Sequence, residues 1–244
     1  MHQRNPYRQP LDFALLSKNY PSLRSHLIGT HAGTVTIDFK NEASLRCLTE
    51  ALLQLDFGLR LSLAEDRLCP PVPNRLNYIL WLQDIIDASC LDQTEPVRGI
   101  DIGTGASTIY PLIGCALNPN WFFTGTDIDT TSLAFAHRNI TQNSLQHRIT
   151  LLQASSSSDD PILVPFALDP NAFDFTMCNP PFYSSVEDVA KSADMKVLQP
   201  HAVRLASLHP VHPFPSQLSS SSIPNDTSSD IYPFQRYAQV LRSR

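Results

Sequence analysis

Short apolar runs alternate with helical patterns through the middle of the chain. The runs VRGIDI (97–102), WFFTGTD (121–127), ITLLQ (149–153) and FDFTMC (173–178) are bounded by turn residues, as buried strands usually are. Segments of helical character separate the first three, at about 106–117 and 131–143. Alternating strands and helices predict an α/β fold whose parallel sheet is covered by helices on both faces.

Other elements are predicted on either side of this region. Residues 34–40 alternate apolar and polar positions like a half-buried strand, and Asn41 is placed to cap a following helix with leucines at steps of three and four. A proline cluster at 70–73 precedes a helix over 75–89, whereas the Ser-rich segment 154–172 predicts a surface loop. The Ser/Pro-rich residues 203–230 predict disorder, with at most a short helix near 233–243.

Charge and cysteine content narrow the class of protein. Eighteen basic and 23 acidic residues among 244 leave a net charge of −5, so any contact with nucleic acid must use a local basic patch. Five scattered cysteines without a C-x-x-C pair argue against a disulfide framework and against a zinc site. The N-terminal residues lack a signal-peptide pattern, and no apolar run approaches a membrane span. We therefore expect a soluble intracellular protein that binds no metal or membrane.

The segment GIDIGTGAS (99–107) predicts a ligand-binding turn between a strand and a helix. Gly103 and Gly105 allow positive φ and close backbone approach, but Thr108 stands where a dinucleotide fingerprint has its third glycine. A ligand that carries adenosine without pyrophosphate fits this pattern better. Asp127, at the tip of the next strand, is placed to hold a ribose, with Asp129 as the weaker candidate. A plain tight turn and a surface aspartate are the structural alternatives.

The segment NPPF (179–182) follows the fourth predicted strand and is the second group of candidate functional residues. Its two prolines stiffen the loop, which then presents Asn179 and Phe182 in a set direction. An amide with a neighbouring carbonyl accepts the hydrogens of an exocyclic amine, and an aromatic ring stacks on a planar base. This combination favours methylation of a nitrogen. The structural alternative is that these residues only form a rigid turn at the end of a strand.

These motifs, together with RNPY, LDFGL, PVPNRLNYI and GIDIGTGASTIYPL, resemble the methyltransferase-like protein 16 family of RNA adenine-N6 methyltransferases. Relatives of that family include a bacterial ribosomal-RNA adenine-N6 methyltransferase. The resemblance covers residues 1 to about 202, with the pieces in the family's order and spacing. It implies a class I, Rossmann-like fold, S-adenosylmethionine as cofactor, and a structured RNA of the U6 spliceosomal or ribosomal class as substrate.

The resemblance also implies roles for individual residues. Arg75 matches the arginine that meets the cofactor carboxylate, and Asp127 matches the acidic ribose ligand. The expected cofactor site comprises Arg75, Asp101, Gly103, Gly105, Ser107 and Asp127, and the expected catalytic tetrad is Asn179, Pro180, Pro181 and Phe182.

The resemblance further assigns the basic N-terminal arm, with Arg4 and Arg8, to RNA binding, and a solvated tail is the alternative. We expect three regions, an N-terminal RNA-binding βα extension (1–73), a partial methyltransferase domain (74–202) and a disordered tail (203–244).

The change to Ser/Pro-rich composition near residue 203 predicts that the later strands of the class I sheet are missing, through a truncated gene model, a retained intron or a shifted frame. The strand at 173–178 would then be an exposed sheet edge.

The expected function is RNA adenine-N6 methylation by a monomer in the nucleus or cytoplasm. A protein glutamine N5 methyltransferase and a catalytically inactive RNA-binding fragment are the alternatives.

Overall fold

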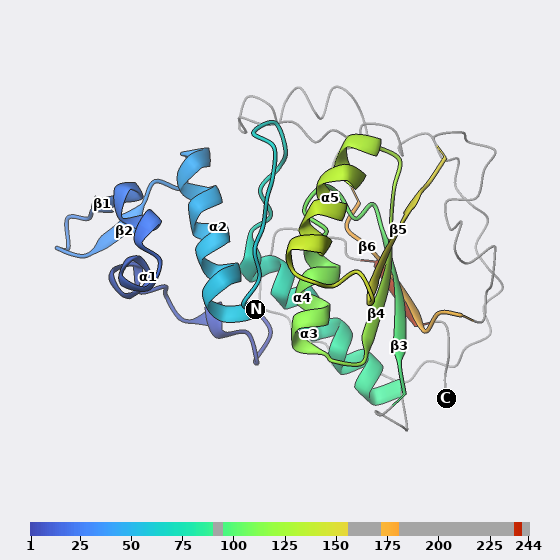
Figure 1. Cartoon of the computed structure of the whole chain (residues 1–244). Helices are drawn as coiled ribbons and strands as arrows, with labels where there is room; N and C mark the ends of the chain where they lie inside the picture. The colour runs from blue at the N-terminus through green and yellow to red at the C-terminus, as the bar shows by residue number, and fades with distance from the viewer. Residues whose placement is uncertain (90–94, 156–171, 181–236, 241–244) are drawn as a thin grey trace, which may run out of the picture.

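The computed structural model describes residues 1–89, 95–155, 172–180 and 237–240. Its main feature is a five-stranded sheet in the order β5-β4-β3-β6-β7, seen nearly edge-on in Figure 1. The strands are β3 (Val97–Ile102), β4 (Trp121–Asp127), β5 (Ile149–Gln153), β6 (Phe175–Cys178) and β7 (Tyr237–Val240). The first four are parallel to one another, as the apolar runs predict. The predicted α/β fold is therefore confirmed.

Three helices pack beside this sheet, on the side that faces the N-terminal extension (Figure 1). They are α3 (Val72–Ser89), α4 (Ile109–Leu117) and α5 (Thr130–Gln142). Helix α3 begins among the prolines, and Pro73 falls in its first turn, where the missing N–H costs nothing. The described residues do not test the prediction of helices on the opposite face, and the loop predicted at 154–172 lies largely outside them.

Strand β7 corrects two predictions about the C-terminal region. Residues 237–240 form a strand, where we expected disorder or a short helix. They pair antiparallel with β6, with Phe175 opposite Val240 and Cys178 opposite Tyr237, so β6 is not the exposed edge that we expected. Four residues carry little intrinsic preference, and pairing with a free strand edge decides their conformation. The remainder of 203–244 lies outside the described residues.

The N-terminal extension is folded along its length, including its first 30 residues, where we expected a basic arm. It contains η1 (Pro6–Arg8), α1 (Phe13–Asn19), η2 (Pro21–His26), the antiparallel pair β1 (Leu27–Gly29) and β2 (Val35–Ile37), and α2 (Glu42–Phe57). Asn41 caps α2 as predicted, because its side chain accepts a hydrogen bond from the Ser44 N–H. Asp12 caps α1 in the same way, and Leu23 is completely buried. Helix capping by Asp12 and the burial of apolar side chains such as Leu23 explain why the first 30 residues fold.

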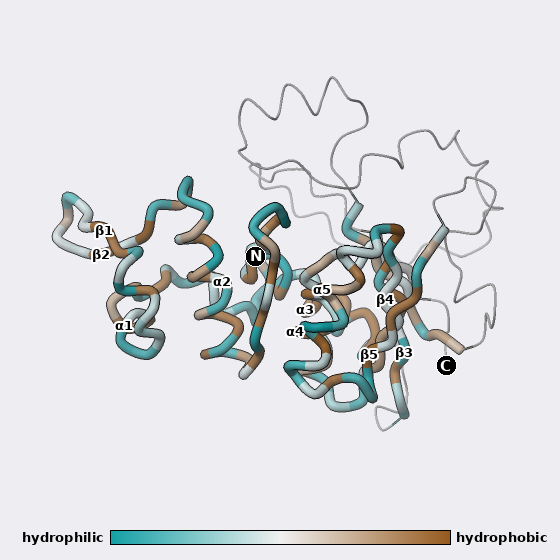
Figure 2. The backbone as a smooth tube through the Cα atoms, turned by 45° about the horizontal axis from the view of Figure 1, so that its top comes forward, coloured by the Kyte–Doolittle hydropathy of each residue, from teal (hydrophilic) through white to brown (hydrophobic). Residues whose placement is uncertain are grey.

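An aromatic cluster fills the space between the sheet and α4. The rings of Trp121, Phe123 and Phe175 lie 5.5–6.0 Å apart, and hydrophobic stretches run along these strands in Figure 2. Two glycines make room for the rings. A Cβ on Gly99 would lie 2.1 Å from the Phe175 ring, and one on Gly114 would lie 2.7 Å from Phe123. The core therefore requires glycine at both positions.

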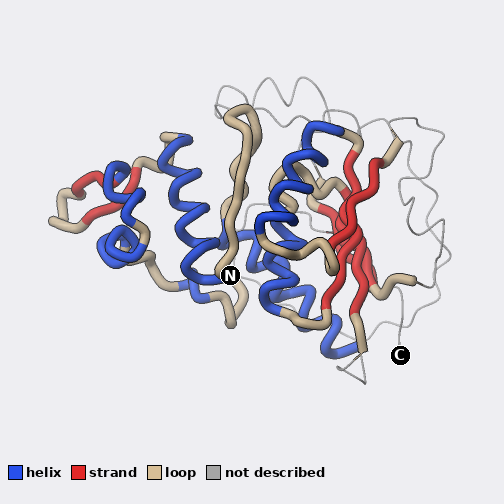
Figure 3. The backbone as a smooth tube through the Cα atoms, in the orientation of Figure 1, coloured by secondary structure: helices blue, strands red, loops and turns tan. Residues whose placement is uncertain are grey.

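An extended segment, residues 59–64, follows α2 on the way to the central sheet and passes between α2 and α5 (Figure 3). We call it the strap. Side-chain amides of α5 and its C-cap bind its backbone. Asn139 Oδ1 accepts from the Ser62 N–H (2.7 Å), and Asn139 Nδ2 donates to the carbonyls of Ser62 (3.0 Å) and Ala106 (2.9 Å). Asn143 contacts Arg60 in the same manner. One buried amide thus joins the strap to the glycine turn.

Candidate functional site

The predicted site residues meet at the carboxyl edge of the sheet. Ile102 lies in register with Thr126 of β4 and with Cys178 of β6, so Gly103, Asp127 and Asn179 lie together at the carboxyl ends of three adjacent strands. The strand order reverses at β3, since the chain adds β4 and β5 on one side and β6 on the other. In open α/β sheets, ligands bind in the crevice at such a switch point.

The glycine turn has the backbone conformation that the sequence predicts. Gly103 has φ +70° and Gly105 has φ +66°, and a Cβ on either would meet no atom within 4 Å. Thr108 is also left-handed, and its hydroxyl lies 2.9 Å from that of Thr104. The Thr104 N–H donates to the Thr126 carbonyl at 2.9 Å, which attaches the turn to β4. The two glycines thus leave open space beside a fixed backbone, and Ser107 lies half-buried in the same turn.

Asp127 holds the turn from the end of β4. Its Oδ2 accepts from the Gly105 N–H at 2.8 Å, and its Oδ1 accepts from the Asp129 N–H at 3.0 Å. Each carboxylate oxygen accepts up to two hydrogen bonds, so both keep a position for a ligand hydroxyl. The ribose role of Asp127 is compatible with this geometry and stays a prediction.

Asp129, the weaker ribose candidate, has structural partners. It caps α5 by accepting from the N–H groups of Thr131 and Ser132, and it forms an ion pair with Arg67. Burial by itself would raise the pKa of Asp129, but the hydrogen bonds from Ser132 and Arg67 lower it to about 2. This carboxylate therefore joins α5 to the segment that follows the strap.

Two buried polar atoms at the site have no hydrogen-bond partner among the described residues. They are Arg75 Nε, a donor, and Asp101 Oδ2, an acceptor. Both residues are more than nine-tenths buried. Burial raises the pKa of Asp101 to about 7, the Asp127 carboxylate adds to this increase, and Thr104 and Arg75 oppose it. Buried polar groups without partners are rare, and a donor beside an acceptor suits a ligand with a carboxylate and an ammonium group.

Arg75 also reaches the end of β6. Its Nη1 donates to the Asn179 Oδ1 at 2.9 Å and to the Tyr110 hydroxyl at 2.8 Å. An arginine on α3 therefore contacts the predicted amine acceptor directly. Asn179 and Pro180 are half-buried at this edge, whereas Pro181 and Phe182 lie outside the described residues.

Arg4 and Arg8 differ in their surroundings. Arg4 forms an ion pair with Asp84 and donates to Gln83 Oε1 at 2.7 Å, so the start of the chain is docked on α3 rather than solvated. His2 contacts the same carboxylate at 2.7 Å, and this bond, with Arg4, lowers the pKa of Asp84. Arg8 is exposed in the last turn of η1. Of the two arginines, Arg8 is the better placed for a phosphate.

Comparison with known proteins identifies the family. A family model described as RNA methyltransferase matches residues 1–214. The chain belongs to this RNA methyltransferase family. It is 42% identical over 189 residues to the RNA N(6)-adenosine-methyltransferase mettl16 of Xenopus laevis, an alignment that covers 76% of this chain and 34% of the relative. The chain thus spans about a third of that relative's length. The predicted resemblance to the methyltransferase-like protein 16 family is confirmed.

Solved structures from the family share the fold. The N-terminal domain of human METTL16 in complex with SAH aligns with a TM-score of 0.67 at 42% identity, covering 75% of this chain and 70% of that one. The human catalytic domain in complex with MAT2A 3'UTR hairpin 1 aligns with a TM-score of 0.68 at 39% identity, covering 79% and 63% of the two chains. The Rossmann-like methyltransferase fold predicted from the sequence is therefore confirmed.

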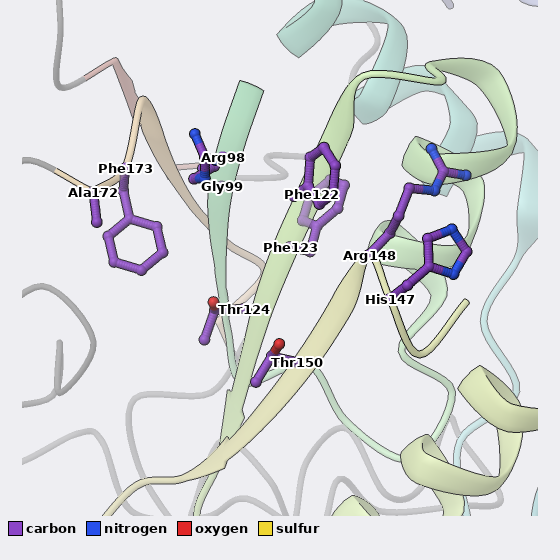
Figure 4. A pocket seen from close by; sticks show the side chains of 10 residues that line it. All are labelled: Arg98, Gly99, Phe122, Phe123, Thr124, His147, Arg148, Thr150, Ala172 and Phe173. Atoms are coloured by element: carbon purple, nitrogen blue, oxygen red, sulfur yellow. The ribbon is translucent and has the colours of Figure 1, made fainter. Parts of the chain in front are cut away.

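A pocket of about 260 Å³ lies elsewhere on this family member (Figure 4). Arg98, Phe122 and His147 line it, near the amino ends of β3, β4 and β5. Gly103, Asp127 and Asn179 lie at the opposite, carboxyl ends of their strands. Side chains alternate along a strand, so Phe122 points away from the face on which Phe123 packs against α4. The pocket is therefore separate from the predicted cofactor site.

The described residues contain no helix that is long and apolar enough to cross a membrane. Nor do they contain a cluster of three or more histidine, cysteine or acidic side chains that could hold a metal. The four cysteines in the described parts of the chain are free.

Tyr110 is the site residue that sequence reasoning missed. It lies in the first turn of α4, two residues after the turn ends, and is 4% exposed. An aromatic residue there has the pattern of an ordinary core position, and the sequence carries no sign of its contact with Arg75.

Proposed function

We propose that the chain transfers the methyl group of S-adenosylmethionine to the N6 atom of an adenine in a structured RNA. The observation that carries this proposal is the pair of unpartnered buried atoms, Arg75 Nε and Asp101 Oδ2, beside Asn179. Family membership supports RNA over the alternative of a protein glutamine. The complexes of the human relative with SAH and with an RNA hairpin support the cofactor and a structured substrate.

The residues at the sheet edge fit such a cofactor by their chemistry. Arg75 would donate to its carboxylate, and Asp101 would accept from its ammonium group. Gly103 and Gly105 leave space for close approach, and Asp127 has acceptor positions for the ribose hydroxyls. When bound, the cofactor supplies an electrophilic methyl group on a sulfonium.

Asn179 would act on the substrate. A neutral adenine amine is acidified as it attacks, and an acceptor at its hydrogens stabilises the charge that develops. The Asn179 carbonyl oxygen accepts one bond from Arg75 and has a second acceptor position for the amine. No strong base is needed if alignment supplies most of the acceleration. Pro180 would keep the loop stiff behind it, and we propose the same for Pro181, with Phe182 stacking on the base.

We further propose that the protein acts as a monomer, in the nucleus or cytoplasm, and that exposed basic residues of the extension, Arg8 first among them, meet RNA phosphates. Arg4 would contribute through its docking on α3 as well as its charge.

The test is methyl transfer from labelled S-adenosylmethionine to an RNA hairpin with one unpaired adenine. The same hairpin with guanine in that position is the control. We expect transfer to the adenine hairpin only, and a loss of about 10²- to 10³-fold in kcat for Asn179→Ala, the usual effect of removing one positioned polar group. A chain that binds S-adenosylhomocysteine but methylates neither hairpin would overturn the proposal and favour an inactive RNA-binding fragment.

A further inference from the structure

Tyr110 lies at the centre of a buried cluster that joins both halves of the predicted site. Its hydroxyl accepts from Arg75 Nη1 at 2.8 Å, and the Arg75 guanidinium carbon lies 5.4 Å from its ring centroid. The Tyr78 ring packs edge-on against it, with centroids 5.3 Å apart. The Tyr78 hydroxyl in turn donates to the Cys178 carbonyl, next to Asn179, at 3.4 Å.

This cluster fixes the orientation of a planar group. The guanidinium has its five N–H donors in one rigid plane, so a hydrogen bond at Nη1 and a ring beside the plane also set where Nε points. Nη1 is the atom that contacts Asn179, and Nε is the donor without a partner among the described residues. The contacts of Tyr110 therefore fix the positions of both Nη1, which meets Asn179, and Nε, which we assign to the cofactor carboxylate.

The orientation of Asn179 follows from the same bond. Arginine has donors only, so the amide must present its carbonyl oxygen to Arg75. That oxygen is the atom that the adenine amine would need as an acceptor. If the guanidinium rotates, the amide loses the contact that distinguishes its oxygen from its nitrogen.

We propose that Tyr110 is a positioning residue that holds the Arg75 guanidinium so that one edge receives the cofactor carboxylate while the other orients the Asn179 carbonyl. This inference rests on the proposed function. It makes cofactor affinity and the alignment of the acceptor depend on a single buried hydroxyl, that of Tyr110.

The test is Tyr110→Phe, which removes the hydroxyl and keeps the ring that packs on Tyr78 and Arg75. A hydrogen bond to a charged group contributes about 1.5–3 kcal/mol, so we expect the dissociation constant of S-adenosylhomocysteine to rise about tenfold or more in calorimetry. We also expect kcat at saturating cofactor to fall about tenfold. Tyr20→Phe is the matched control, because it removes a hydroxyl bonded to Glu50 in the N-terminal extension.

A double-mutant cycle separates positioning from a general loss of packing. Lysine has no Nη1 atom, so in an Arg75→Lys background Tyr110→Phe should change cofactor affinity by less than about twofold. Additive effects of the two substitutions would overturn the inference, as would unchanged affinity and kcat in Tyr110→Phe alone. Melting temperatures with and without S-adenosylhomocysteine give a second measure of binding for any variant that is less stable.

The outcomes also distinguish this inference from the proposed function. Suppose that the effects of Tyr110→Phe and Arg75→Lys on cofactor affinity are coupled, but the protein methylates no adenine. This result would support the positioning role of Tyr110 and overturn the proposed adenine methylation. Normal adenine methylation that is unaffected by Tyr110→Phe would overturn the positioning role alone.

Discussion

Gly103→Ala tests whether the open side of the glycine turn is where the cofactor lies. A Cβ at Gly103 would meet no protein atom within 4 Å, so the substitution creates no internal clash. Its cost to folding comes from φ +70°, and the left-handed conformation costs a residue with a Cβ about 1–2 kcal/mol. For a chain of this size, that corresponds to a fall in Tm of about 2–8 °C.

Gly58 provides a matched control. It has φ +67°, a Cβ there would also meet nothing within 4 Å, and it caps α2 away from the sheet edge. Gly58→Ala should therefore lower Tm by a similar amount and leave affinity for S-adenosylhomocysteine unchanged. Gly103→Ala should weaken that affinity at least tenfold, because the added methyl occupies space that we assign to the ligand.

Differential scanning fluorimetry measures the first quantity and calorimetry the second. Equal affinities in the two alanine variants would refute the assignment, since the space beside Gly103 would then be solvent only. A much larger fall in Tm for Gly103→Ala than for Gly58→Ala would contradict the statement that strain alone sets the cost.

Further predictions concern three charged residues. Asp127→Ala should weaken cofactor binding at least tenfold, through the loss of two ribose hydrogen bonds of about 1.5–3 kcal/mol each, and calorimetry on a folded variant checks this. Affinity for the cofactor ammonium should rise as pH increases through about 7, where Asp101 ionises, and Asp101→Asn should abolish this dependence. Because the folded-state pKa of Asp101 is raised, protonation of this carboxyl stabilises the fold, fully below about pH 4 and no longer once the pH has risen through 7. Asparagine has no such contribution to lose, so the melting temperature of Asp101→Asn should decline less between about pH 4 and 7 than that of the unsubstituted protein. Arg8→Ala should reduce the slope of log K for RNA binding against log salt by about 0.7–0.9. An unchanged slope would show that Arg8 does not contact a phosphate.

The sequence predicted the central sheet well because its strands are buried on a parallel ladder. Such strands appear as apolar runs bounded by turns, and the predicted bounds of 97–102, 121–127 and 149–153 agree with the structure. The end strand β7 was not predictable, because its conformation depends on pairing with β6 more than 50 residues earlier. The folded elements within residues 1–30 were missed for a related reason, since they are short and depend on packing against each other.

The site was predictable to a similar extent. Residues that follow adjacent parallel strands must meet at one edge, so sequence alone brings Gly103, Asp127 and Asn179 together. The contact of Arg75 with Asn179 depends instead on how α3 docks against β6, which no local pattern encodes. The same holds for the ion pair that engages Arg4.

The strap has a consequence for the cooperativity of the molecule. Asn139 is fully buried and uses both its oxygen and its nitrogen on Ser62 and Ala106. Opening the strap would break both hydrogen bonds between this amide and Ser62, and also the bonds that Asn143 makes to Arg60, and each such bond contributes about 0.5–1.5 kcal/mol. The N–H groups of Arg60 and Ser62 should therefore exchange with deuterium at the rate of the glycine turn rather than at the rate of a surface loop. A perturbation that loosens the N-terminal extension would therefore increase backbone motion beside Gly105, because Asn139 bonds both the strap and Ala106. No residue of the extension needs to touch the cofactor for this effect.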